Sequence, residues 1–97
     1  MPSKKPNSVG PKSPLAVGNS VFIRTITYHY TGKIVSISPE EILLETAAWI
    51  ASSGRWNAAL TSGTLDEVEP FPDGVSIARA SVVDISPWKH GLPTTVK

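Results

Sequence analysis

The sequence predicts a mainly β domain: five short antiparallel strands, strongly bent into a small barrel, with one helical insert after the third strand. Short runs of β-branched and aromatic residues alternate with turn residues, as in antiparallel sheets. The apolar period changes to that of a helix only once, within residues 47–60. Ninety-seven residues allow one domain with a limited core, and a bent five-stranded sheet closes most easily as a barrel.

The strands are expected where apolar alternation lies between turn signals. Both parities of the first run contain apolar side chains, so this strand should be buried on much of both sides. Gly32 should mark a bend or bulge at the start of the second strand. The expected strands are 21–30 with a turn within 27–31, then 32–38, 42–46, 75–79 and 81–85.

The helical insert is predicted from four side chains on one helical face: Trp49, Ser53, Trp56 and Leu60. Two interpretations of its tryptophans stay open. In one, the helix covers the mouth of the barrel and both rings are core. In the other, a tryptophan lies beside Arg55 at a subunit interface or ligand pocket, where stacking and a fixed cation suit a base or nucleotide.

Charge and composition divide the chain into three parts. Residues 1–17 are rich in proline and lysine and are expected to form a disordered basic tail; 18–88 form the barrel domain, and 89–97 a loose C-terminal tail. The first twelve residues carry three lysines, whereas the remainder has six Lys/Arg against eight Asp/Glu. An acidic body disfavours general nucleic-acid binding, which normally requires a basic face.

The sequence contains no catalytic constellation, so we expect a protein that is not an enzyme and has no cofactor. The two histidines, His29 and His90, lie in no metal-ligand spacing, and there is no cysteine. Glu40 and Glu41 are adjacent at a turn, where side chains point apart. The sequence has no signal peptide and no apolar run near the roughly 20 residues of a membrane span, so we expect a cytoplasmic protein without a membrane partner.

Two segments resemble the motifs of the Sm/LSm family, which includes the Hfq-type proteins. Residues 21–45 are similar to the first Sm motif, with apolar alternation, a strand-opening glycine, a turn, and a short apolar strand ending in an acid. Residues 75–85 are similar to the second motif, although Ala80 replaces its glycine. SH3-like barrels share much of this pattern. The acidic string 67–74, with the stretch 47–50, also resembles small phage and prophage proteins.

The resemblance implies a homo-oligomeric ring of about five to seven subunits, in which edge strands of adjacent copies pair head to tail. Its turn at 38–41 carries two glutamates where the family places its RNA-pocket aspartate and asparagine. The candidate interface residues are Val75, Ile77, Val82, Val83 and Ile85. The candidate ligand- or RNA-binding residues are Arg79, Arg55, Trp49, Tyr30 and Ser38.

Three functions remain open at this stage. The first is a ring-forming binding or scaffold protein, which the acidic body and the missing catalytic groups favour. The second is an Sm-like protein that binds single-stranded RNA, with Arg79 and the tail lysines on phosphate. The third is a nucleotide or small-molecule binder with Trp49, Arg55 and Arg79 in an inter-subunit pocket. Arg79 has the alternative of a salt bridge to Asp84 or to a neighbouring subunit.

Overall fold

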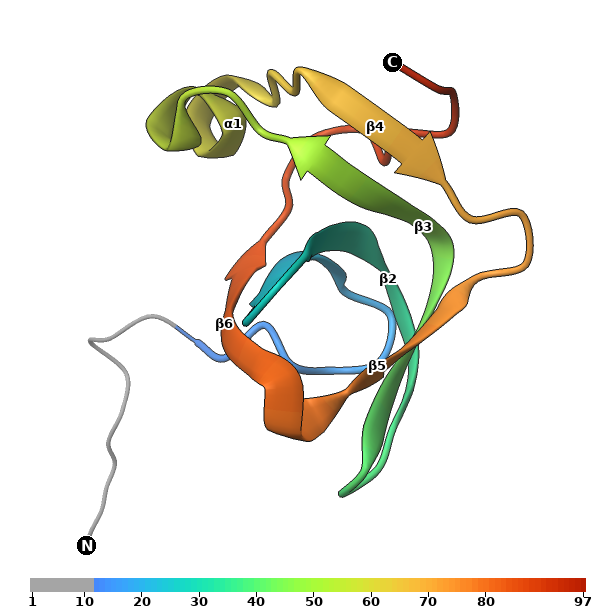
Figure 1. Ribbon diagram of the computed structural model, residues 1–97. Coiled ribbons are helices and arrows are strands. Elements are labelled where there is room, and N and C mark those ends of the chain that lie inside the picture. The colour runs from blue at the N-terminus through green and yellow to red at the C-terminus, as the bar shows by residue number, and fades with distance from the viewer. Residues whose placement is uncertain (1–11) are drawn as a thin grey trace, which may run out of the picture.

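The computed structural model describes residues 12–97, which form a six-stranded antiparallel sheet and one α-helix (Figure 1). The strands are β1 (Ser20–Thr25), β2 (His29–Ile37), β3 (Glu41–Ser52), β4 (Glu67–Pro70), β5 (Val75–Ala78) and β6 (Val82–Pro87). Helix α1 (Trp56–Ser62) lies between β3 and β4, and a 3₁₀ turn, Arg79–Ser81, joins β5 to β6. The strand order is β4-β3-β2-β1-β6, with β5 also paired to β3.

The predicted mainly β, antiparallel architecture with one helix after the third strand is confirmed at this level. The sheet has six strands instead of five, because part of the acidic segment 67–74 forms β4 against the end of β3. The expected first strand is divided into β1 and β2 by a turn in which Thr25 N–H and its hydroxyl both donate to the carbonyl of Tyr28. The sheet is strongly curved but does not close into a barrel. Strand β5 pairs with β3 and β6 pairs with β1, and β5 and β6 form no ladder with each other in the described residues.

Strand β3 organises the sheet because it pairs with three other strands. Its first half pairs with β5, its second half with β4, and both halves with β2. The strand bends at Thr46, whose φ is 47°. The register of the β2–β3 ladder shifts at Gly32, where an added Cβ would lie 3.0 Å from the Cβ of Leu44. The bend expected at Gly32 is therefore confirmed, and it reflects the close approach of the two strands.

The curved sheet buries side chains on both faces. One set, the sheet core, joins β1, β2, β3 and β5: Val21, Ile23, Ile34, Ile42, Leu44, Ala47 and Ile77. The other set, the helix core, joins the sheet to α1 and the C-terminal segment: Phe22, Ala48, Ile50, Ala59, Leu65, Val68 and Trp88. Consecutive residues of β1 enter opposite cores, which confirms the expected burial of this strand on both sides.

The helix predicted over residues 47–60 is wrong for its first six residues, which are the end of β3. Hydrogen-bonded neighbours on both sides decide this, because Trp49 is opposite Tyr30 in β2 and Glu69 in β4. Helix α1 begins only at Trp56 and ends at Ser62, so Trp49 and Trp56 share no helical face. Tertiary strand pairing has outweighed a helical spacing of apolar residues that arose by coincidence.

The C-terminal segment after β6 is docked along β4, and the expectation of a loose tail from residue 89 is wrong. Leu92 packs against the helix core next to Trp88, which is 4% exposed. Lys97 and Val68 exchange two backbone hydrogen bonds of 3.0 Å, so the segment covers the outer edge of β4 (Figure 1). Residues 1–11 of the predicted disordered tail lie outside the described chain. Within 12–17, Leu15 already packs against the sheet core.

Candidate functional site

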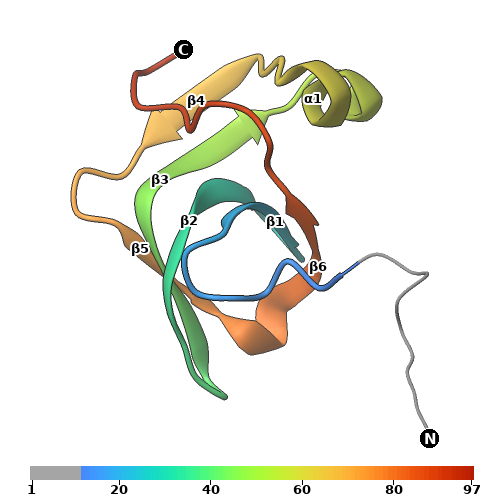
Figure 2. The same cartoon turned by 180° about the vertical axis from the view of Figure 1, so that it is seen from behind.

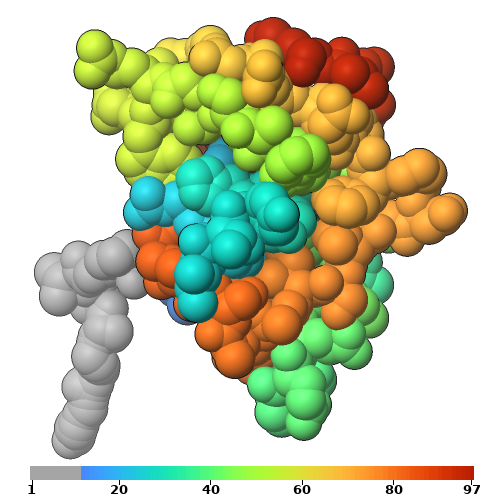
Figure 3. Space-filling model, in the orientation of Figure 1, coloured from blue at the N-terminus to red at the C-terminus, as the bar shows by residue number. Residues whose placement is uncertain are grey.

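Four aromatic side chains line an open cleft of about 220 Å³: Tyr28, Tyr30, Trp49 and Phe71. We call it the aromatic cleft. The rings form two pairs, with centroids 5.6 Å apart for Tyr28 and Trp49 and 6.1 Å apart for Tyr30 and Phe71. The first pair is edge-to-face at 84°, a favourable geometry for aromatic rings. In Figure 3 the start of β2 (cyan), the end of β3 (green) and the β4–β5 loop (orange) meet on one face.

The cleft exists because the bent sheet brings three segments together. Tyr30 and Trp49 are cross-strand partners in the β2–β3 ladder, beyond the bend at Thr46. Phe71 comes from the β4–β5 loop, and its N–H donates a 2.8 Å hydrogen bond to the carbonyl of Ala47. Prolines on either side of Phe71 restrict this loop further. The aromatic walls are therefore held on strands and on a tethered loop.

Two further hollows share lining residues with the aromatic cleft. One, of about 230 Å³, shares Tyr28 and Trp49 and extends along Thr27–His29 and Ile50–Ala51. The other, of about 210 Å³, shares Phe71 and is otherwise lined by Thr46, Ala47, Pro70, Pro72, Pro93 and Thr94. Because adjoining hollows share lining residues, we treat the three together and call them the aromatic groove. No lysine or arginine of residues 12–97 lines any part of it.

The electrostatic character of the aromatic groove is neutral with an acidic border. Burial, followed by the charge of Arg24, lowers the pKa of His29 below its ordinary value, so the imidazole is neutral at pH 7. Burial and the neighbouring Tyr28 raise the pKa of Tyr30 further above neutral pH. Glu69 lies opposite Trp49 in the β3–β4 ladder, and Asp73 follows in the loop.

A second cluster fixes α1 to the sheet. Arg24 Nε donates a 2.9 Å hydrogen bond to Asp84 Oδ1, and Arg24 Nη2 donates to Asp84 Oδ2. The Arg24 guanidinium lies 4.6 Å from the centre of the Trp56 ring, which packs edge-to-face on Phe22 at 4.8 Å. The hydrogen bond from Arg24 lowers the pKa of Asp84. Because the cation is engaged by both a carboxylate and a ring, this cluster is a structural anchor.

The five ligand-binding candidates lie at three different places. Trp49 and Tyr30 are brought together in the aromatic cleft. Arg79 and Ser38 meet at the β2–β3 turn, where Arg79 Nη1 donates a 3.0 Å hydrogen bond to the Ser38 carbonyl. Arg55 is exposed immediately before α1. The structure therefore separates Trp49 from Arg79, and the salt bridge considered between Arg79 and Asp84 is replaced by the Arg24–Asp84 pair.

The five interface candidates contribute mainly to the sheet core. Ile77 belongs to the sheet core and is 3% exposed, and Val75, Val82 and Ile85 pack against the sheet core. Val83 differs, because it is the extra residue where the β1–β6 register shifts and it is 62% exposed. Within the described chain, β5 pairs with β3 alone and β6 with β1 alone, so each strand has an unpaired edge.

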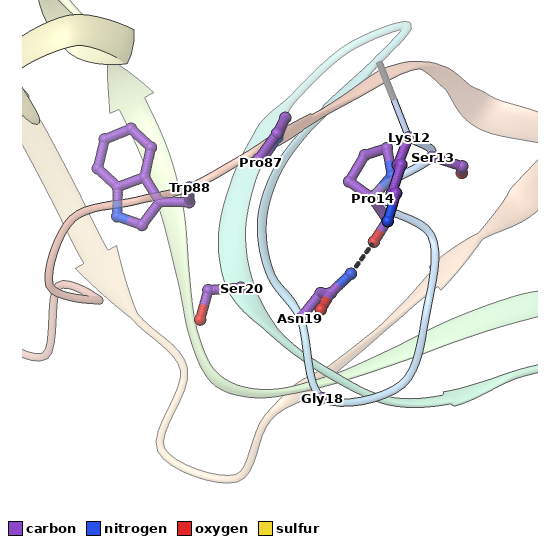
Figure 4. Close-up of a pocket in the computed structure, with 8 residues that line it drawn as sticks. All are labelled: Lys12, Ser13, Pro14, Gly18, Asn19, Ser20, Pro87 and Trp88. Atoms are coloured by element: carbon purple, nitrogen blue, oxygen red, sulfur yellow. Dashed lines mark hydrogen bonds between the residues drawn. The ribbon is translucent and has the colours of Figure 1, made fainter. Parts of the chain in front are cut away.

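Another hollow, of about 420 Å³, lies where the first described residues cross β6 (Figure 4). Its lining residues are Lys12–Pro14, Gly18–Ser20, Pro87 and Trp88. The Asn19 side chain donates a 3.0 Å hydrogen bond to the Pro14 carbonyl (Figure 4). This bond uses the side-chain amide to hold the entering chain, and the hollow presents no group with evident chemistry.

Sequence reasoning missed Tyr28 and Phe71 as site residues. Each had a signal: an aromatic ring within a polar turn, and an aromatic ring between two prolines. Comparison with protein-family models, curated proteins and solved structures finds no match to this chain. Among residues 12–97, no His, Cys, Asp and Glu side chains gather in a set that could hold a metal ion. None of the helices described there is long and apolar enough to cross a membrane.

Proposed function

We propose that the protein is a self-associating scaffold with an Sm-like core, which assembles into a ring by strand addition and binds through its aromatic groove. The observation that carries the proposal is the pairing of the last two strands. Strand β5 lies on β3, β6 lies on β1, and a 3₁₀ turn joins them. With α1 and β4 set aside as an insert, β1, β2, β3, β5 and β6 match in number the five strands expected of an Sm-like or SH3-like barrel.

The unpaired edges of β5 and β6 supply a plausible contact between copies. Exposed edges have free N–H and C=O groups that invite another strand, and monomeric proteins usually protect them with charge, proline or a cover. Residues 75–78 contain no charge and no proline. Pairing of the β5 edge of one copy with the β6 edge of the next is a head-to-tail contact, and such contacts form a ring when the rotation closes.

Nucleic acid and nucleotides are less well supported as ligands. Both need cations near their phosphates. Arg79 is held on the Ser38 carbonyl beside Glu40 and Glu41, and the aromatic groove has no cation among its lining residues. A scaffold with a neutral-to-acidic binding surface therefore agrees better with the observed charges.

Native mass spectrometry and light scattering at tens of micromolar test the proposal, and we expect one closed oligomer. Val83→Pro should lower its subunit number while the far-ultraviolet circular dichroism stays unchanged, because Val83 is the unpaired bulge residue on the β6 edge. Val83→Ser keeps the backbone donor and should assemble like the wild type. A wild-type protein that stays monomeric would contradict the proposal.

A further inference from the structure

We propose that the aromatic groove binds the proline- and lysine-rich N-terminal segment, residues 1–11, of another copy of the chain. The inference extends the proposed self-association by naming the occupant of the groove, and it rests on that association for the proximity of the second copy. Three properties of the groove point to this segment: its aromatic walls, its adjoining hollows and its charge.

The aromatic walls fit proline. Proline-rich segments bind aromatic-lined grooves as preformed polyproline II helices, which lose little entropy on binding. Such segments have free backbone carbonyls and few N–H groups, so they need donors from the binding surface. Tyr28 and Tyr30 carry phenol groups in the cleft, and a tyrosine phenol is a hydrogen-bond donor at neutral pH. Residues 1–11 contain three prolines: Pro2, Pro6 and Pro11.

The adjoining hollows of the groove suit an extended segment. Its three hollows adjoin one another through shared aromatic residues, so an occupant can pass from one to the next. A polyproline II segment rises about 3.1 Å per residue, so eleven residues span roughly 34 Å. The same chain can therefore place prolines in more than one hollow.

Charge distinguishes this segment from other occupants. Residues 1–11 carry Lys4 and Lys5 and no acidic residue. The groove has no lysine or arginine among its described lining residues, and Glu69 borders it opposite Trp49. The complementary charges favour a basic peptide and disfavour a nucleic acid, whose phosphates would find no cation.

The position of residue 12 favours the groove of another copy. Lys12 lies beside Pro87 at the end of β6, on the far side of the strand order from β4 (Figures 1, 2 and 4). The groove lies on β2, β3 and the loop after β4. In a head-to-tail assembly the β6 side of one copy faces a different side of its neighbour, which brings the segment of one copy toward the groove of the next. Linkage of the two copies raises the effective concentration of the segment.

The test uses the full-length protein with its own segment weakened by Lys4→Glu and Lys5→Glu, titrated with a synthetic peptide of residues 1–11. The readout is the indole N–H resonance of Trp49 in two-dimensional NMR, assigned from the spectrum of Trp49→Phe. We expect a saturable shift of this resonance. Replacing the three prolines of the peptide by alanine should weaken binding about tenfold, because the rings lose their preformed ligand.

Two further variants of the same protein test the groove itself. Tyr28→Ser removes an aromatic wall that is 52% exposed, so it should weaken the peptide about tenfold without unfolding the protein. Glu69→Lys should weaken binding and reduce its salt dependence. Glu40→Lys makes the same charge change at the β2–β3 turn, away from the groove, and should leave affinity unchanged.

The outcomes separate the inference from the proposed ring. A Trp49 resonance that does not shift, or a shift that Tyr28→Ser and Glu69→Lys leave unchanged, would overturn the inference even if native mass spectrometry shows a ring. Equal binding of a lysine-free proline peptide would overturn the named occupant. A saturable shift in a protein that stays monomeric would overturn the ring and leave the binding of the segment by the groove supported.

Discussion

Replacing Trp56 by alanine should loosen α1 from the sheet and lower the free energy of unfolding by about 2 kcal/mol. Trp56 is the first residue of the helix, and its half-buried ring packs edge-to-face on Phe22 at 4.8 Å. The guanidinium of Arg24, which like Phe22 belongs to β1, lies 4.6 Å from the centre of the Trp56 ring. The ring is therefore the direct link between α1 and β1.

The magnitude follows from the degree of burial. Truncation of a fully buried tryptophan costs about 3–5 kcal/mol, and a half-buried ring loses about half of that. The partly exposed cation–π contact adds about 0.5–1 kcal/mol. Alanine is a better helix former than tryptophan by about 0.5 kcal/mol, which offsets part of the loss. The net cost is about 2 kcal/mol, or a fall of roughly 8–16 °C in Tm for a domain of this size.

Urea unfolding at one fixed protein concentration measures the effect, because self-association would make stability depend on concentration. Tyr28→Ala is the matched control: it removes an exposed ring that also packs edge-to-face, on Trp49, and it should cost about 1 kcal/mol or less. A double-mutant cycle with Arg24→Met should give a coupling energy of about 0.5–1 kcal/mol. A Trp56→Ala protein within about 0.5 kcal/mol of the wild type would refute the anchoring role of this ring.

Five other substitutions test separate features of the fold and its dependence on pH. Thr31→Val should raise the free energy of unfolding by about 1 kcal/mol in the same urea assay, because the buried Thr31 hydroxyl has no hydrogen-bond partner among the described residues; a loss of stability would show that the hydroxyl is paired. Gly74→Ala should cost about 2 kcal/mol or more, since φ is 81° and a Cβ would lie 2.5 Å from the Leu44 carbonyl oxygen. Gly18→Ala, with φ of 94° but open space, should cost less, and equal losses would exclude the steric clash as the cause. Acidification should lower Tm from about pH 6.5 downward, because the lowered pKa of His29 lets the unfolded chain bind a proton that the folded protein does not; His29→Gln should remove this loss, and an unchanged profile would contradict it. Asp84 also makes acid destabilising, but at lower pH. Arg24 lowers the pKa of Asp84, so its stabilisation of the fold is complete above the ordinary value of 3.8 and is lost only below it. Asp84→Asn should therefore flatten only that part of the Tm profile.

Local patterns predicted the first half of the sheet well and the middle of the chain poorly. The turn residues and Gly32 depend on backbone geometry that a few neighbouring residues determine. The structure has the bend at the glycine, although Gly32 lies within β2 and not at its start. The prediction for residues 47–52 was wrong because their side chains are compatible with a helical spacing as well as with a strand. The pairing of Trp49 with Tyr30 and Glu69 decides between them, and those partners are distant in the sequence.

Only part of the candidate site was predicted, again because residues distant in the sequence complete it. Tyr30 and Trp49 were identified singly, and the structure joins them, but the loop that brings Phe71 to them depends on the hydrogen bond to Ala47. One of the three hypotheses placed Arg79 with Trp49 in an inter-subunit pocket. Within one copy, the Arg79 guanidinium lies on the Ser38 carbonyl, away from the aromatic cleft.

The bend of β3 connects the fold to the proposed binding activity. Before Thr46, β3 pairs with β5, whose other edge is unpaired in the described chain; after Thr46, it pairs with β4 and carries Trp49 into the aromatic cleft. A single strand thus supports both the edge that would recruit another copy and the surface that would bind its N-terminal segment. Straightening β3 would remove the cross-strand position of Trp49 and the pairing with β4 together. Because Gly32 has no Cβ, β2 can approach Leu44 closely at this bend. A glycine at position 32 is therefore a requirement of the site as well as of the sheet.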